Sequence, residues 1–198
     1  MNPIYAALGT TIFEHMSGLA RETGGINLGQ GFPDGTGPQD VLAAAARALT
    51  EESNQYPPMA GLPVLRAAVA AHYARHQGFA CTPEEVIVTS GATEALAAAI
   101  LALVSPGDEV VMFTPLYDAY APLVERAGGI VRAVALEPPG WRIDESLIAR
   151  AFTPATRLVI LNNPLNPAGR VFEETELRLL AEAIVAHDAL AISDEVWE

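Results

Sequence analysis

Lysine is absent from this chain of 198 residues, because all 11 of its basic residues are arginine. Any reaction that needs a lysine amine as nucleophile or anchor therefore cannot be completed by this polypeptide alone. Cysteine is nearly absent as well, and the single Cys81 excludes an internal disulfide and a cysteine-based metal cluster. We therefore expect a cytoplasmic protein without a metal centre.

Long apolar runs and an excess of positive charge are also lacking. No apolar run approaches the length of a membrane span, and the first residues lack the basic and then apolar pattern of a signal peptide. The net charge of −13 argues against nucleic acid or an anionic membrane surface as a partner. With 51% hydrophobic and 18% charged residues, the composition is that of a globular chain with a core.

Strand-like and helix-like segments alternate regularly from Glu84 onward. The short apolar segments expected to form strands are Val86–Thr89, Glu109–Phe113, Ile130–Leu136, Arg157–Leu161 and Leu190–Ser193. The helices expected between and before them are Ile12–Arg21, Asp40–Leu49, Leu62–Gln77, Glu94–Val104, Tyr120–Ala127, Asp144–Ala151 and Glu173–His187. This order predicts an α/β fold, with a mostly parallel sheet and helices on both faces.

The stretch from Val86 to Val104 reads as a buried strand, a tight polar turn and a strong helix. Such a turn directs free backbone N–H groups and the positive end of the helix to one point, which suits a phosphate. On this stretch alone a simpler interpretation is favoured, in which Ser90 and Thr93 cap the helix and Gly91 turns the chain. The other strand ends decide between the two.

Ligands collect at the carboxyl ends of the strands in parallel sheets. Besides the turn at Gly91, the residues that follow the predicted strands are an aromatic, Tyr117, an amide, Asn166, and a carboxylate, Asp194. Each has an ordinary alternative: a half-buried tyrosine, a residue of an Asn-Pro turn and a carboxylate that caps the next turn. Together they predict a phosphate cup, an aromatic ring, an amide and a carboxylate on one edge of one sheet.

These groups resemble the pyridoxal-phosphate enzymes of fold type I, specifically the class I/II aminotransferases. The segments that carry the resemblance are Ile26–Asp34, Asn54–Gly61, Ser90–Glu94, Thr114–Asp118, Asn162–Gly169 and Ser193–Glu198. The most specific is Asn-Asn-Pro-x-Asn-Pro-x-Gly followed by Ser-Asp-Glu-Val. Ile-Asn-Leu-Gly-Gln-Gly-Phe-Pro-Asp with Asn-Gln-Tyr-Pro-Pro-Met-Ala-Gly is similar to the kynurenine and methionine aminotransferase subgroup.

The resemblance implies a role for each residue that follows a strand. Asp194 is expected to face the pyridine nitrogen of the cofactor and keep it protonated, which makes the ring an electron sink. Asn166 is expected to donate to the phenolic oxygen and to lie next to the substrate. Tyr117 is expected to stack on the pyridine ring.

Further roles follow from the resemblance alone. Gly91, Ala92 and Thr93 are expected to hold the cofactor phosphate. Gly31 is expected near the substrate carboxylate, and Tyr56 against the phosphate of the neighbouring subunit's cofactor, which implies a homodimer of the complete protein.

Two departures from the family pattern stand out. Where the family usually has tyrosine this chain has Trp197, whose indole N–H can donate to the phenolic oxygen but cannot accept; packing is an equally fair role. The family's Schiff-base lysine and two arginines lie beyond Asp194, so no catalytic residue is expected in this chain. We therefore expect an amino-terminal half, with residues 1–45 as an arm belonging to the small domain and 46–198 as the first part of the large cofactor domain.

Three functional hypotheses remain open. The first is a pyridoxal-phosphate-dependent aminotransferase, moving an amino group from an amino acid to a 2-oxo acid, whose present chain is inactive alone because the lysine is missing. The second is a carbon–sulfur β-lyase of the same fold. The third is a non-catalytic remnant or assembly piece.

Overall fold

The computed structural model describes residues 2–31 and 35–196. They fall into two compact units, one made of residues 2–8 with 90–196 and the other of residues 9–89. Each unit is described by itself.

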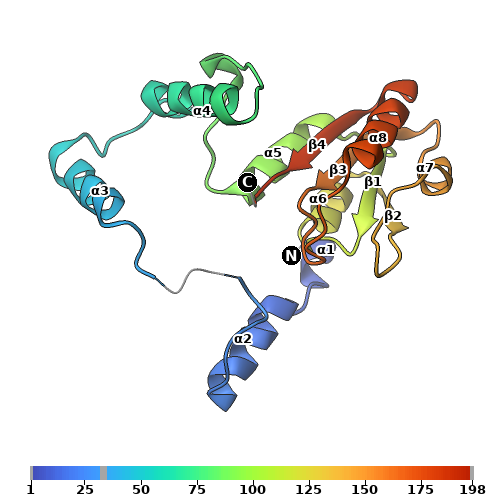
Figure 1. Cartoon of the computed structure of the whole chain (residues 1–198), viewed down its shortest axis with the longest axis horizontal. Helices are drawn as coiled ribbons and strands as arrows, with labels where there is room; N and C mark the ends of the chain where they lie inside the picture. Colours follow the sequence, from blue (N-terminus) through green and yellow to red (C-terminus); the bar gives the residue numbers. More distant parts are fainter. Residues whose placement is uncertain (1, 32–34, 197–198) are drawn as a thin grey trace. The chain divides into compact units, whose positions relative to one another are not determined.

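The larger unit is built around a parallel sheet. Among the described residues the sheet has four strands, which are β1 (Glu109–Thr114), β2 (Ile130–Ala135), β3 (Thr156–Asn162) and β4 (Leu190–Asp194). Their order is β2-β1-β3-β4, and every neighbouring pair is parallel (Figure 1). The predicted α/β class is confirmed.

Helices cover both faces of this sheet. The helices of the unit are α1 (Pro3–Ala6), α5 (Ala92–Leu103), α6 (Tyr120–Ala127), α7 (Glu145–Ala151) and α8 (Glu174–Ala186). Successive side chains of a strand point to opposite faces. Val111 and Phe113 of β1 accordingly join one buried cluster with residues of α7 and α8, whereas Val110 and Met112 join another with residues of α5 and α6.

One predicted strand does not form. Residues Val86–Thr89 are extended but belong to no sheet among the described residues. A strand requires a neighbouring strand to satisfy its backbone groups. Here the backbone groups of this segment bond to a loop and to a side chain instead. The Val88 N–H donates to the carbonyl of Ala60 in a loop at 3.0 Å, and the Val86 carbonyl accepts from Arg66 Nε at 2.8 Å. The prediction of a strand at Val86–Thr89 is therefore wrong for this structure.

The smaller unit is helical, with α2 (Ile12–Thr23), α3 (Gln39–Glu51), α4 (Pro63–His76) and the short 3₁₀ turn η1 (Pro83–Glu85). The hydroxyl of Thr11 accepts from the Glu14 N–H and so starts α2. The helices begin and end within two residues of the predicted positions.

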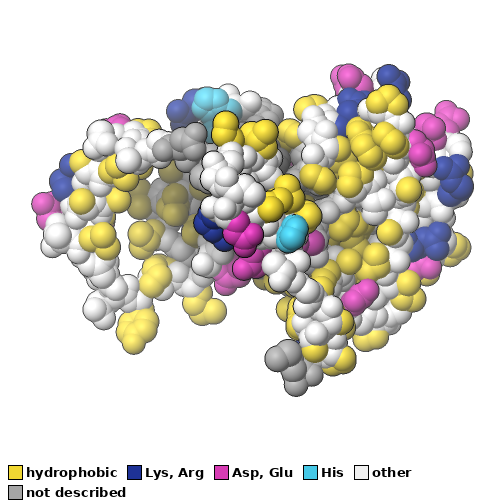
Figure 2. Space-filling view, turned by 90° about the horizontal axis from the view of Figure 1, so that it is seen from below, with side chains coloured by type: hydrophobic (Ala, Val, Ile, Leu, Met, Phe, Trp, Pro, Cys, Tyr) yellow, Lys and Arg dark blue, Asp and Glu magenta, His cyan; other side chains and the backbone are white. Residues whose placement is uncertain are grey.

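Many large hydrophobic side chains are exposed at the surface, where they are drawn in yellow in Figure 2. The four most exposed of them lie in the smaller unit and are Ile26, Leu28, Tyr56 and Met59. Exposed apolar side chains that gather on one face are typical of a surface that packs against another chain or segment. Within the described ranges, no helix combines the length and apolar character needed to cross a membrane.

Candidate functional site

A pocket of about 210 Å³ opens at the carboxyl edge of the sheet in the larger unit. Its lining residues are Ala92, Thr93, Leu96, Tyr117, Tyr120, Asn162, Asn166, Asp194 and Val196. Five predicted site residues, from four separate segments, thus share one cavity: Ala92, Thr93, Tyr117, Asn166 and Asp194. The parallel topology brings Tyr117, Asn166 and Asp194 together, because strands β1, β3 and β4 end at the same edge, and the beginning of α5 brings Ala92 and Thr93 to the same pocket.

The beginning of α5 forms one wall of the pocket. Gly91 is the residue before the helix and has φ +83° and ψ 170°, a conformation that favours glycine. The Glu94 carboxylate folds back to accept from the N–H of Ser90. The N–H groups of the first helical turn have no acceptor within the helix, and Ala92 and Thr93 bring this turn to the pocket. Gly91 provides the turn that directs those groups, and its predicted contact with the phosphate stays a prediction.

Replacing Gly91 by alanine tests whether that turn needs glycine. A Cβ at Gly91 meets no atom within 4 Å, so the expected loss comes from backbone conformation and not from a clash. We expect the larger unit to lose about 1–3 kcal/mol of stability in urea unfolding followed by circular dichroism. Gly140→Ala is the matched control, because Gly140 has no positive φ and the nearest atom to its Cβ is 3.4 Å away. Equal stability of the two variants contradicts the prediction.

The amide side of the pocket comes from the loop after β3. The backbone of Leu165 pairs with that of Arg170, which closes a tight loop with Asn166 inside it. Asn162, at the end of β3 and 5% exposed, connects this loop to β4. Its Oδ1 accepts from the Asn166 N–H at 2.7 Å, and its Nδ2 donates to the Asp194 carbonyl at 2.9 Å. One buried side chain thus fixes the backbone of both Asn166 and Asp194.

The carboxylate of the pocket belongs to Asp194, the last residue of β4. Its Oδ2 accepts from the Tyr120 hydroxyl at 2.5 Å, and its Oδ1 accepts from the Val196 N–H at 3.2 Å. Its carbonyl also accepts from the Asn163 N–H at 3.1 Å. The orientation of Asp194 is therefore set from both its backbone and its side chain.

Two tyrosines adjoin that carboxylate. Tyr117 and Tyr120 meet edge to face, with ring centroids 5.6 Å apart. Tyr120 is 2% exposed, and burial raises the pKa of its hydroxyl far above the ordinary value, with the hydrogen bond to Asp194 and the charge of that carboxylate adding to the effect. The phenol therefore stays protonated and remains a donor at neutral pH.

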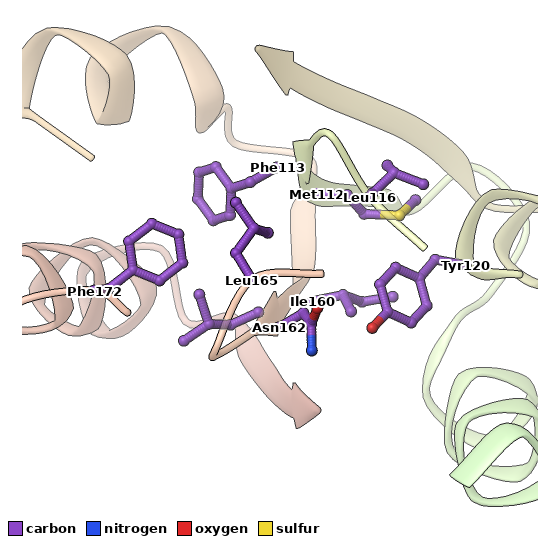
Figure 3. Close-up of a pocket in the computed structure, with 9 residues that line it drawn as sticks. Met112, Phe113, Leu116, Tyr120, Ile160, Asn162, Leu165 and Phe172 are labelled. Atoms are coloured by element: carbon purple, nitrogen blue, oxygen red, sulfur yellow. The ribbon is translucent and has the colours of Figure 1, made fainter. Parts of the chain in front are cut away.

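The inner side of the pocket is well packed. Tyr120 and Asn162 border a second cavity of only about 10 Å³, which is otherwise lined mainly by apolar side chains of β1, β3 and the loop after β3 (Figure 3). A space of this size holds at most about one water molecule. Tyr120 and Asn162 therefore have little room to change orientation.

Three other predicted site residues belong to the smaller unit or lie outside the described residues. Gly31 and Tyr56 belong to the smaller unit, where Gly31 is exposed and Tyr56 is 97% exposed. Trp197 lies outside the described residues, so its predicted contact with the cofactor stays a prediction.

Sequence reasoning missed two residues of the pocket with polar side chains, Tyr120 and Asn162. A signal for Tyr120 was its position three residues after Tyr117, because a turn of that length brings both rings together; the Tyr120 N–H bonds to the Tyr117 carbonyl. Asn162 directly follows the apolar part of its strand, the position from which the other candidates were chosen.

The groups that line the pocket together indicate the chemistry of its ligand. The N–H groups of the first turn of α5 and the Thr93 hydroxyl can bind an anionic oxygen. The Tyr117 ring can pack against a flat aromatic ring. The Asn166 amide can bond to a polar substituent of that ring, and the Asp194 carboxylate can bond to a cationic nitrogen. Among the described residues that line the pocket none is basic. The ligand that fits is therefore a small aromatic that is anionic at one end and protonated on its ring.

Comparison with known proteins gives a consistent result. Residues 23–198 match the family model described as aminotransferase class I and II. The chain is 50% identical over 192 residues to a probable N-succinyldiaminopimelate aminotransferase, DapC, of Mycobacterium tuberculosis, covering 96% of this chain and 48% of that protein. It is 47% identical over 192 residues to the methionine aminotransferase of Escherichia coli, covering 96% and 50%.

A solved structure of N-succinyldiaminopimelate aminotransferase from M. tuberculosis superposes with a TM-score of 0.93 at 47% identity, over 99% of this chain and 52% of that chain. The chain thus spans about half the length of the curated relatives it matches.

Proposed function

Because the chain belongs to the class I and II aminotransferase family, we propose that it forms the part of a pyridoxal-phosphate-dependent aminotransferase that binds the cofactor ring and phosphate. Members of this family use pyridoxal phosphate and act on amino acids and 2-oxo acids. The observation that carries the proposal is the meeting of Thr93, Tyr117, Asn166 and Asp194 in one pocket of the larger unit.

The proposed roles match the chemistry of each group. Ala92 and Thr93, at the beginning of α5, hold the phosphate, and Gly91 provides the turn before them. Tyr117 packs against the ring, Asn166 donates to its phenolic oxygen and Asp194 keeps its nitrogen protonated. When bound, the cofactor supplies a protonated ring that takes up electrons from the bond broken at the substrate α-carbon.

A homodimer of the complete protein belongs to the same proposal. Tyr56 is 97% exposed in the smaller unit, and Met59 is fully exposed close to it. We propose that Tyr56 contacts the cofactor phosphate of the neighbouring subunit, that Trp197 donates to the phenolic oxygen and that Gly31 lies near the substrate carboxylate. The exposed apolar side chains of the smaller unit support a partner surface of this kind.

Two further expectations stay predictions. One is the division of the complete protein into an arm at residues 1–45 and a cofactor domain that begins at residue 46. The other is a cytoplasmic location.

The absence of lysine limits what this chain does alone. Its residues can bind and orient the cofactor, but the amine that anchors the cofactor and moves a proton at the α-carbon has to come from elsewhere. With no basic residue lining the pocket, backbone N–H groups bear most of the phosphate binding. We therefore propose weak, reversible cofactor binding and no turnover for residues 1–198.

The test joins this chain to a lysine-bearing second half of a family member and measures amino transfer from a panel of amino acids to 2-oxo acids. We expect transfer in the joined protein and none with residues 1–198 alone. Asp194→Ala in the joined protein is expected to abolish most of the activity.

Cofactor binding without transfer to any 2-oxo acid contradicts the proposal. Release of pyruvate from cystathionine-like substrates in the same assay identifies a carbon–sulfur β-lyase instead. Amino transfer by residues 1–198 alone contradicts the need for a lysine from elsewhere.

A further inference from the structure

The Tyr120 hydroxyl makes the shortest polar contact to the pocket's carboxylate. Tyr120 begins α6 and Asp194 ends β4, so the bond joins two elements that lie 74 residues apart in the sequence. The bond is 2.5 Å long, and Tyr120 itself is 2% exposed and lines the pocket beside Asp194. A hydrogen bond to a charged acceptor is stronger than one between neutral groups.

The other contacts of Asp194 leave its side chain less restrained. The Asp194 carbonyl is held by Asn162 and Asn163, which fixes the backbone but not the rotation of the carboxylate. The Val196 N–H reaches Oδ1 at a longer 3.2 Å, from a residue only two positions away. The Tyr120 hydroxyl is therefore the group on a distant element that fixes the orientation of the carboxylate.

We propose that Tyr120 is a positioning residue, whose hydroxyl holds the Asp194 carboxylate in the orientation that receives the protonated ring nitrogen of the cofactor. The inference rests on the proposed function, since it concerns how the chain engages pyridoxal phosphate. Tyr120 acts through Asp194 and contributes no proton to the reaction, because its buried hydroxyl keeps its proton at neutral pH. The edge-to-face contact with Tyr117 holds its ring in place, and the small cavity beside Tyr120 leaves the ring little room to move (Figure 3).

The experiment compares two ligands that differ in one ring atom. Pyridoxamine 5′-phosphate carries the ring nitrogen, and its 1-deaza analogue has a C–H there with the same phosphate and hydroxyl. Neither ligand has an aldehyde that could react with the terminal amine of the chain. Equilibrium dialysis with residues 1–198 gives the ratio of the two dissociation constants, which stays meaningful even when only part of a variant is folded.

For the unmodified chain we expect tighter binding of the nitrogen-containing ligand, and for Tyr120→Phe we expect that preference to fall about three- to tenfold. Tenfold corresponds to about 1.4 kcal/mol, just below the range for a hydrogen bond to a charged group. Asp194→Ala is expected to remove the preference, and adding Tyr120→Phe to it is expected to change nothing further, because the two residues act as one unit.

Tyr5→Phe is the matched control, because Tyr5 is 40% exposed in α1 and absent from the pocket; its preference is expected to equal that of the unmodified chain. A Tyr120→Phe variant that weakens both ligands equally, or neither, overturns the positioning role while leaving the proposed function in place. An unmodified chain that shows no preference, or binds neither ligand, overturns the role of Asp194 and the proposed function with it.

Discussion

Replacing Glu176 by alanine is expected to destabilise the larger unit by about 3–5 kcal/mol, the range for removing one partner of a buried ion pair. Glu176 lies in the first turn of α8 and is 8% exposed. Its Oε2 accepts from Arg170 Nη2 at 2.5 Å and from the Glu173 N–H at 2.8 Å, and its Oε1 accepts from the Ile143 N–H at 3.0 Å. Removing the carboxylate leaves the Nη2 group of Arg170 and two backbone donors without this acceptor.

The size of the effect comes from the three segments that Glu176 connects. It links the beginning of α8 to the loop after β2 and to the loop after β3 that contains Asn166. Arg170, whose side chain is 19% exposed, also donates to the Gly140 carbonyl at 3.0 Å and so joins the same two loops. The loss is a large share of the 5–15 kcal/mol typical of a domain.

Glu174→Ala on the same helix is the matched control. Its ion pair with Arg178 is 2.7 Å long, but the two side chains are 84% and 67% exposed. Such an exposed pair contributes only about 0.3–0.5 kcal/mol. Urea unfolding of both variants measures the difference, and a similar loss in the two contradicts a special role for Glu176.

The helices and most of the sheet were predictable because their signals are local. The helix expected at Tyr120–Ala127 is α6 at its observed bounds, and the helix expected at Glu173–His187 is α8 to within one residue at each end. The segment Val86–Thr89 has the same apolar, β-branched composition as the true strands. It forms no strand because pairing depends on a neighbour elsewhere in the chain, and local composition carries no information about that neighbour.

For the site, the residues at the ends of the strands were predictable from the sequence, but the contacts that support them were not. A parallel sheet brings the ends of its strands to one edge, so the meeting of Tyr117, Asn166 and Asp194 follows from topology. The hydrogen bonds that hold these residues in place do not follow from the topology. The bond from Tyr120 to Asp194 spans 74 residues, and it requires the packing of α6 against the sheet to be known.

Replacing Asn162 by alanine is expected to weaken both the fold and ligand binding. The buried amide is the acceptor for the Asn166 N–H and a donor to the Asp194 carbonyl. The carbonyl keeps the N–H of Asn163 as a second donor, whereas the Asn166 N–H loses its acceptor. The cost of such an unsatisfied group is about 1–3 kcal/mol, which urea unfolding measures. Binding of pyridoxamine 5′-phosphate is expected to weaken as well, because two proposed ligand-binding residues lose their common support.

Asn166→Ala separates positioning from direct contact. The Asn166 side chain is only partly buried, and its proposed role is a hydrogen bond to the ligand. Its loss is expected to weaken binding by about 2- to 10-fold, the equivalent of about 0.5–1.5 kcal/mol, with unfolding changed by less than about 0.5 kcal/mol. Asn162→Ala, by contrast, is expected to lower both quantities. If Asn162→Ala lowers stability but binds the ligand as tightly as the unmodified chain, the connection between β3, Asn166 and Asp194 serves the fold alone.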